Sequence, residues 1–179
     1  MRKLILASAM LTAAMAAPAL AQTSTTGTVT IDGSVAPRCL FTTASATINA
    51  GELALTGTGA SAGKLDASKL DGQSRTLTGW CNGTASSMAV EAKPVVNTTV
   101  TSAPPAGFDR VVNYTATATA NAVDASDSSV VAGAGSSSTV GLFTGNVTVT
   151  LSNSSTPTSG LLVAGAYQGE TVVTLTAAN

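Results

Sequence analysis

The 179-residue chain contains no histidine, and charged residues make up only 9% of it. Without histidine the chain lacks the commonest general base and the commonest metal ligand. A typical soluble domain carries about 25% charged residues. After residue 21 the chain has six basic and nine acidic residues, with no basic patch of the kind that binds nucleic acid. We therefore expect no enzyme, no cofactor, no metal site and no nucleic-acid partner.

The first 21 residues have the three parts of a signal peptide. Met1-Arg2-Lys3 is a basic head, residues 4–17 form an apolar run, and Ala19-Leu20-Ala21 is a small-x-small cleavage site. The run is too short for a membrane anchor. The sequence therefore predicts an exported protein whose mature chain begins at Gln22 and contains no membrane span.

Cys39 and Cys81 are the only cysteines in the chain. In an exported protein they lie in an oxidising compartment, so we expect them to form a disulfide. Their neighbours do not form a redox motif, which favours a structural bridge over thiol chemistry. Trp80, the sole tryptophan, is expected to pack against this disulfide in the core. If it faced outward, it could instead stack on carbohydrate.

Alternating apolar and polar residues predict several short strands. Residues 27–35 alternate, with Val29, Ile31, Gly33 and Val35 on one face, and predict a half-buried strand. Pro37 ends this strand just before Cys39. Further strands are expected over residues 75–81, 88–92, 110–117, 145–151 and 170–176, with shorter strand-like pieces at 47–49 and 53–55.

The segments between these strands are rich in turn-forming residues. Asn82-Gly83 predicts a hairpin turn that joins the strand at 75–81 to the strand at 88–92. Residues 124–138, rich in Ser, Ala and Gly, are expected to form a loop. Seven or eight short strands without a long helix predict an all-β sandwich of about seven strands.

Two stretches of the chain resemble known families. Gly27-Thr28-Val29-Thr30-Ile31-Asp32-Gly33-Ser34-Val35, followed by Cys39 and by a second cysteine about forty residues later, resembles the start of a chaperone–usher pilin subunit. Residues 165–176 are similar to the end of spore-coat-protein-U-like domains, which are relatives of the archaic pilins. The resemblance implies an immunoglobulin-like sandwich that lacks its last strand and is completed by a donor strand.

The resemblance also implies a function. The protein would be a structural subunit of a fimbria (pilus), assembled by donor-strand exchange for surface adhesion or biofilm formation. Its partners would be other pilin subunits, a periplasmic chaperone and an outer-membrane usher. The chain would cross the inner membrane to the periplasm and then reach the cell surface of a bacterium.

In this interpretation residues 22–35 are a candidate donor segment, and residues 36–179 are the pilin-like domain. Val29, Ile31 and Val35 would fill successive pockets of the next subunit, and Gly33 would fit a shallow one. Val173 and Leu175 of the last strand would line the acceptor groove. Two alternatives remain open from the sequence. Residues 27–35 could pair within their own domain, or the protein could be a self-contained secreted or periplasmic module that binds carbohydrate or protein.

Overall fold

The computed structural model describes residues 24–179, so the predicted signal peptide at residues 1–21 lies outside the described part. The chain divides into two units between Ser34 and Val35. Residues 24–35 belong to no strand or helix, and all of them are exposed. The half-buried strand expected over residues 27–35 is therefore absent. Alternation defines two faces, but a strand also needs a partner, and alternation does not provide one.

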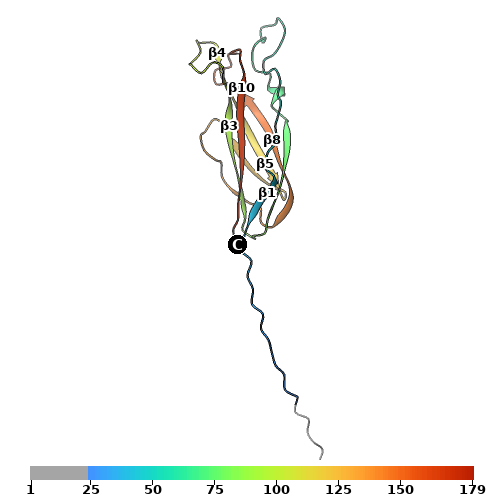
Figure 1. Cartoon of the computed structure of the whole chain (residues 1–179). Helices are drawn as coiled ribbons and strands as arrows, with labels where there is room; N and C mark the ends of the chain where they lie inside the picture. Colours follow the sequence, from blue (N-terminus) through green and yellow to red (C-terminus); the bar gives the residue numbers. More distant parts are fainter. Residues whose placement is uncertain (1–23) are drawn as a thin grey trace, which may run out of the picture. The chain divides into compact units, whose positions relative to one another are not determined.

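The second unit is all-β, as the sequence predicted (Figure 1). The strands among the described residues are β1 (Cys39–Thr43), β2 (Ser74–Cys81), β3 (Ser87–Asn97), β4 (Phe108–Asp109), β5 (Val111–Ala120), β6 (Val123–Ser128), β7 (Ser138–Thr139), β8 (Phe143–Ser155), β9 (Leu161–Leu162) and β10 (Tyr167–Thr176). A short 3₁₀ turn, η1 (Ala67–Lys69), precedes β2.

Eight of the ten strands in residues 24–179 form one sheet. Its hydrogen-bonded order is β1–β2–β8–β5–β3–β10, with β6 paired to β5 and β7 paired to β3. Successive strands along this path are antiparallel. The two-residue strands β4 and β9 form a separate parallel pair.

The core follows the alternation of three central strands. In β8 the expected inward residues Val147, Val149 and Leu151 are 0%, 9% and 6% exposed. In β5 both Val112 and Tyr114 are buried, as predicted. The remaining buried apolar side chains on β3 and β5 are Met88, Val90, Ala92, Ala116, Ala118 and Ala120. Every second residue of these strands therefore faces one continuous core.

The expected hairpin at Asn82-Gly83 is wrong. β2 pairs with β1 and β8, whereas β3 pairs with β5, β7 and β10, so the chain crosses to another part of the sheet. Asn82 is held by hydrogen bonds to the residues before β1 instead of forming a turn. A Cβ atom on Gly83 would collide with the carbonyl oxygen of Ala178, so the connection passes closely against the C-terminal residues.

The expected loop at residues 124–138 is also wrong in its first part. Val123–Ser128 form β6, which pairs with β5, and Ala125 is 3% exposed. The backbone N–H of Ala92 donates to the Asp127 carboxylate at 2.8 Å. A segment made mostly of Asp and Ser becomes a strand here because an existing strand provides the ladder.

The predicted disulfide between Cys39 and Cys81 is present. The two cysteines are paired positions of the β1–β2 ladder, so the bridge ties the first strand of the domain to the sheet. Trp80 does not pack against it in the core. Neighbouring residues of a strand point to opposite faces, and Trp80 lies opposite Leu40 and Thr144 on the outer face. The expectation of a core tryptophan is therefore wrong.

Candidate functional site

The two ends of the strand order, β1 and β10, approach each other at one point. A Cβ atom on Gly79 of β2 would lie 3.2 Å from Cδ1 of Phe41 and 3.4 Å from Cδ1 of Leu175. It would also lie 2.9 Å from the carbonyl oxygen of Leu40, so the close approach of these strands depends on glycine at this position. The sheet is therefore nearly closed at Gly79.

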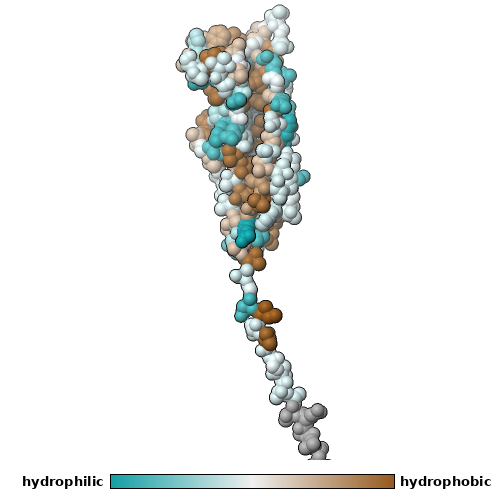
Figure 2. Space-filling view, in the orientation of Figure 1, coloured by the Kyte–Doolittle hydropathy of each residue, from teal (hydrophilic) through white to brown (hydrophobic). Residues whose placement is uncertain are grey.

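Beyond this point a groove of about 1320 Å³ separates the two ends of the sheet. One wall consists of Phe41 and residues 44–54, and the other consists of residues 162–173, which include the first part of β10. The floor is made by Leu70, which follows η1, and by side chains of β2, β5 and β8, namely Leu77, Tyr114, Val149 and Leu151. In Figure 2 apolar surface, coloured brown, runs along a hollow on this face of the domain.

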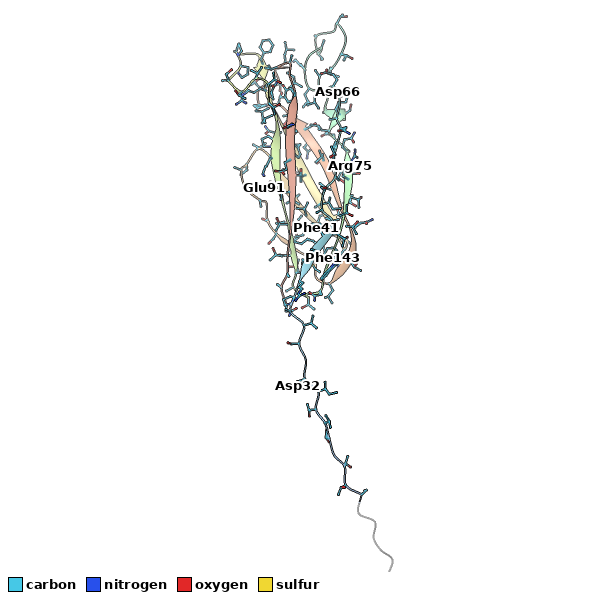
Figure 3. The ribbon with its side chains drawn as sticks, in the orientation of Figure 1. Asp32, Phe41, Asp66, Arg75, Glu91 and Phe143 are labelled. Atoms are coloured by element: carbon cyan, nitrogen blue, oxygen red, sulfur yellow. A yellow bond between two sulfur atoms is a disulfide. The ribbon has the colours of Figure 1, made fainter. Side chains whose placement is uncertain are left out.

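The wall at residues 44–54 is irregular. Its backbone is held by Arg75, labelled in Figure 3, whose Nε donates to the carbonyl oxygen of Thr47 at 2.7 Å. Ile48 and Ala50 are half-buried against the core, and Leu53 is buried. The strand-like pieces expected at 47–49 and 53–55 are reduced to an isolated bridge at Ala54. Side chains and a backbone bond from Asp66 to Leu53 fix the wall, whereas residues 44–52 make no backbone–backbone hydrogen bond within the described part of the chain and can pair with another strand.

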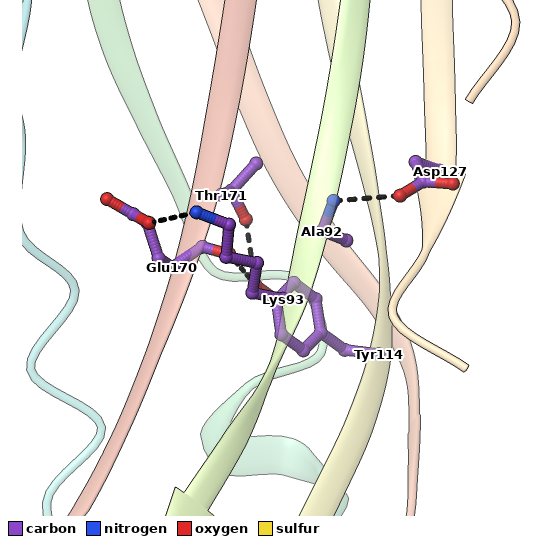
Figure 4. Close-up of polar contacts among 6 residues, drawn as sticks. All are labelled: Ala92, Lys93, Tyr114, Asp127, Glu170 and Thr171. Atoms are coloured by element: carbon purple, nitrogen blue, oxygen red, sulfur yellow. Dashed lines mark hydrogen bonds and ion pairs between the residues drawn. The ribbon is translucent and has the colours of Figure 1, made fainter. Parts of the chain in front are cut away.

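The β10 wall contains a bulge where its register against β3 shifts between Gln168 and Glu170. A Cβ atom on Gly169 would lie 2.7 Å from Cγ2 of Val95, so glycine permits the close approach. The Tyr114 hydroxyl donates to the Glu170 carbonyl oxygen at 2.8 Å and lies 2.9 Å from Thr171 Oγ1 (Figure 4). Burial raises the pKa of Tyr114, so its hydroxyl stays a neutral donor. The groove floor therefore holds the bulge in place.

β3 has strand partners along both of its edges, whereas β10 has a partner along only one edge within the described part of the chain. The edge of β3 that faces away from β10 pairs with β5 and β7, and Asp127 and Gly135 bond to the stretch between them. β10 pairs with β3 alone among the described residues, and a surface ion pair of 2.7 Å between Lys93 and Glu170 links the two strands. An uncovered strand edge is a template for another strand. The free edge of β10 borders the groove.

The structure places the sequence-predicted site residues in three locations. Val173 lines the groove, whereas Leu175 lies further along β10, at the closed end beside Gly79. Val29, Ile31 and Gly33 belong to the first unit and Val35 begins the second. Val29, Ile31 and Val35 are 88%, 91% and 81% exposed. The wall at residues 44–54 was not predicted from the sequence, because it consists of small and polar residues with isolated apolar ones.

Comparisons of the chain with protein-family models, with curated proteins and with solved structures found no match. Within residues 24–179 no group of three or more His, Cys, Asp or Glu side chains could hold a metal ion. No helix in that same part of the chain is long and apolar enough to cross a membrane. The groove is therefore the candidate site that the geometry supports, because it is elongated, has an apolar floor and is bordered by a free strand edge.

Proposed function

We propose that this protein is an exported structural subunit of a fimbria that assembles by donor-strand exchange. In this view the domain is an immunoglobulin-like β-sandwich of about seven principal strands whose missing last strand comes from a neighbouring subunit. The observation that carries the proposal is the groove between β10 and the wall at residues 44–54. A strand inserted there would pair with the free edge of β10 and cover the apolar floor.

The proposed occupant is residues 27–35 of a second copy of the chain. Nine extended residues span about 30 Å, and their apolar side chains recur at every second position. Val29, Ile31 and Val35 are almost fully exposed in the structure. Burying each of them would contribute about 1.5–3 kcal/mol. Main-chain hydrogen bonds would supply further affinity, and the alternate side chains would set the register, with Gly33 at a shallow point of the groove.

The groove also gives a reason for the proposed partners. An exposed apolar groove with an unpaired edge promotes aggregation, so it needs a cover between export and assembly. A periplasmic chaperone would cover it, and an outer-membrane usher would exchange the chaperone for the donor segment of the next subunit. The assembled fimbria would then serve surface adhesion or biofilm formation, as the family resemblance of residues 27–39 and 165–176 implies.

The test is a blot of material sheared from the source cells and run in SDS with and without boiling. Donor-strand polymers should give a ladder of regular multiples that collapses to one band on boiling. Ile31→Asp should abolish the ladder, because it places a charge in an apolar pocket. Thr30→Asp is the matched control, because Thr30 lies on the polar face of the segment and should leave the ladder intact. A monomer in both lanes for the wild type would overturn the proposal and favour a self-contained binding module.

A further inference from the structure

The side chain of Asn82 binds the backbone just before β1. The Asn82 backbone N–H donates to the Arg38 carbonyl oxygen at 3.0 Å. Its side-chain Oδ1 accepts the Arg38 N–H, and its Nδ2 donates to the Ala36 carbonyl oxygen at 3.2 Å. Together these bonds extend the β1–β2 ladder past the Cys39–Cys81 pair. In this extension the side-chain amide of Asn82 makes hydrogen bonds that the backbone of a strand would otherwise make.

Two covalent features act on the same residues. Proline restricts the residue before it to extended conformations, so Pro37 disfavours a turn at Ala36. The disulfide fixes Cys39, the residue that follows Arg38, against Cys81 of β2. Residues 36–38 are therefore constrained by Pro37 and by the disulfide as well as by the side chain of Asn82.

This stretch matters because β1, which follows it, contributes Phe41 to the lining of the groove. If residues 27–35 bind in a groove, they can enter either the groove of their own chain or that of a second copy. Only Ala36, Pro37 and Arg38 separate them from β1. To enter its own groove the segment would have to reverse direction within these three residues and run back beside the free edge of β1.

Such a reversal conflicts with the contacts and with the sequence. A three-residue hairpin loop places one residue in the left-handed region, where glycine is favoured, and none of the three residues is glycine. The turn would also break the hydrogen bonds that Asn82 makes to Ala36 and Arg38. Self-insertion would therefore require both a strained loop and the loss of the Asn82 hydrogen bonds. Neither is required when residues 27–35 continue from Ala36 without a turn and bind a second copy.

We propose that Asn82, together with Pro37, is a positioning device that keeps the donor segment out of its own groove and directs it to a second copy. This inference rests on the proposed function, because it assumes that residues 27–35 occupy a groove of this kind. Asn82 is exposed and is not among the residues that line the groove. It therefore acts only through the backbone of Ala36 and Arg38.

The experiment compares the full chain, expressed with its own N-terminal leader, as wild type, Asn82→Ala and Asn82→Ala/Pro37→Gly. Monomer and multimer are separated by size, and amide hydrogen exchange of residues 27–35 is measured in each fraction. In the wild type we expect protection in the multimer and none in the monomer. In the double variant the monomer should become protected, and the monomer-to-multimer ratio should rise about tenfold, since each lost hydrogen bond shifts the balance by roughly a factor of two to ten.

Two further variants provide a control and a smaller, graded change. Asn146→Ala changes an exposed asparagine of β8 and should behave as the wild type. Asn82→Asp keeps the acceptor for the Arg38 N–H and loses the donor to Ala36, so it should give a smaller rise of about threefold. It remains informative if Asn82→Ala does not fold.

The outcomes separate this inference from the proposed function. A protected multimer whose ratio to monomer is the same in all variants would overturn the role of Asn82 and leave donor-strand exchange standing. Protection of residues 27–35 in the wild-type monomer would also overturn it, because self-insertion would then occur despite the Asn82 contacts. Absence of protection in every wild-type fraction would overturn the proposed function itself.

Discussion

Residues 27–35 and residues 145–151 have nearly the same pattern and opposite structures. Each stretch begins with glycine and alternates threonine or another polar residue with valine, isoleucine or leucine. In β8 the side chains of Val147 and Leu151 are 0% and 6% exposed, whereas those of Val29 and Ile31 are 88% and 91% exposed. The comparison shows that alternation specifies two faces of a strand and leaves open what covers the apolar one.

The difference arises from the neighbours of each stretch. β8 lies between β2, which pairs with residues 143–150, and β5, which pairs with residues 147–155, so every part of β8 has a strand partner and residues 147–150 have one on each side. Residues 24–35 have no strand assignment. The domain meanwhile has a groove with a free edge on β10. An unpaired apolar segment and an unfilled apolar groove in one chain are complementary, which is the basis of the proposed assembly.

The largest expected effect concerns the disulfide that joins the start of the domain to β2. Replacing both Cys39 and Cys81 with serine removes a cross-link between residues 42 apart in the sequence. The free energy of unfolding should fall by about 4 kcal/mol, because the unfolded chain gains the entropy of an open loop. Denaturant titration of the variant and of the reduced wild type should give the same loss. An unchanged midpoint in both would show that β1 is held by its ladder alone.

The second prediction tests the two alternating stretches directly. Val147→Ala should reduce the free energy of unfolding by about 2 kcal/mol, because it leaves a cavity in the core. Ile31→Ala, at an apolar position of the alternating N-terminal segment, should leave the unfolding of the monomer unchanged and weaken assembly. Thermal unfolding and the SDS ladder measure the two effects. If Ile31→Ala destabilised the monomer as much as Val147→Ala, the segment would be buried in its own domain.

The third prediction concerns Asp109, a buried carboxylate at the β4–β9 pair. It accepts hydrogen bonds from Gly160 N–H at 2.8 Å and from Thr158 Oγ1 at 2.9 Å. Burial by itself raises the pKa of Asp109, but these donors outweigh burial and hold the pKa below its ordinary value of 3.8. The stability that Asp109 contributes is therefore complete well above pH 4 and is lost as the pH falls through the lowered pKa of the folded state.

Asp109→Asn should therefore cost about 2 kcal/mol at neutral pH, because it weakens the charge-assisted bonds that the buried Asp109 carboxylate accepts from Thr158 and Gly160. It should also flatten the acid-induced loss of stability that we expect of the wild type below about pH 4. The unfolding midpoint measured between neutral and acid pH checks both effects. The exposed Asp32, changed in the same way, is the control. An unchanged acid profile in Asp109→Asn would mean that other carboxylates dominate the pH dependence.

The smallest effect is expected at the groove floor. Tyr114→Phe removes the hydroxyl that binds the Glu170 carbonyl oxygen and should lower the free energy of unfolding by about 1 kcal/mol. Because this bond holds the bulge in the β10 wall, the variant should also reduce the yield of SDS-resistant multimer. Thr42→Val, which removes a hydroxyl bonded to the Thr78 carbonyl oxygen between β1 and β2, is the matched control for the loss of one side-chain hydroxyl that does not line the groove. Equal multimer yields in the two variants would contradict a specific role for the bulge.

Sequence reasoning located most of the core strands. The stretches expected at 75–81, 110–117, 145–151 and 170–176 all lie within or largely within strands, because apolar and polar residues largely alternate along them. The disulfide followed from the number of cysteines and the predicted export. The crossing at Asn82-Gly83, strand β6 and the groove wall at residues 44–54 were not found. Each of these depends on contacts with residues far away in the sequence.

The sequence by itself determined the all-β class, the inward faces of the central strands and the cysteine pair, because alternation and composition are local properties. Only the tertiary structure decided the strand order, the closure of the sheet at Gly79 and the free edge of β10. These follow from which strands meet, and one alternating pattern suits many partners. The same pattern therefore becomes a core strand at residues 145–151 and an exposed segment at residues 27–35.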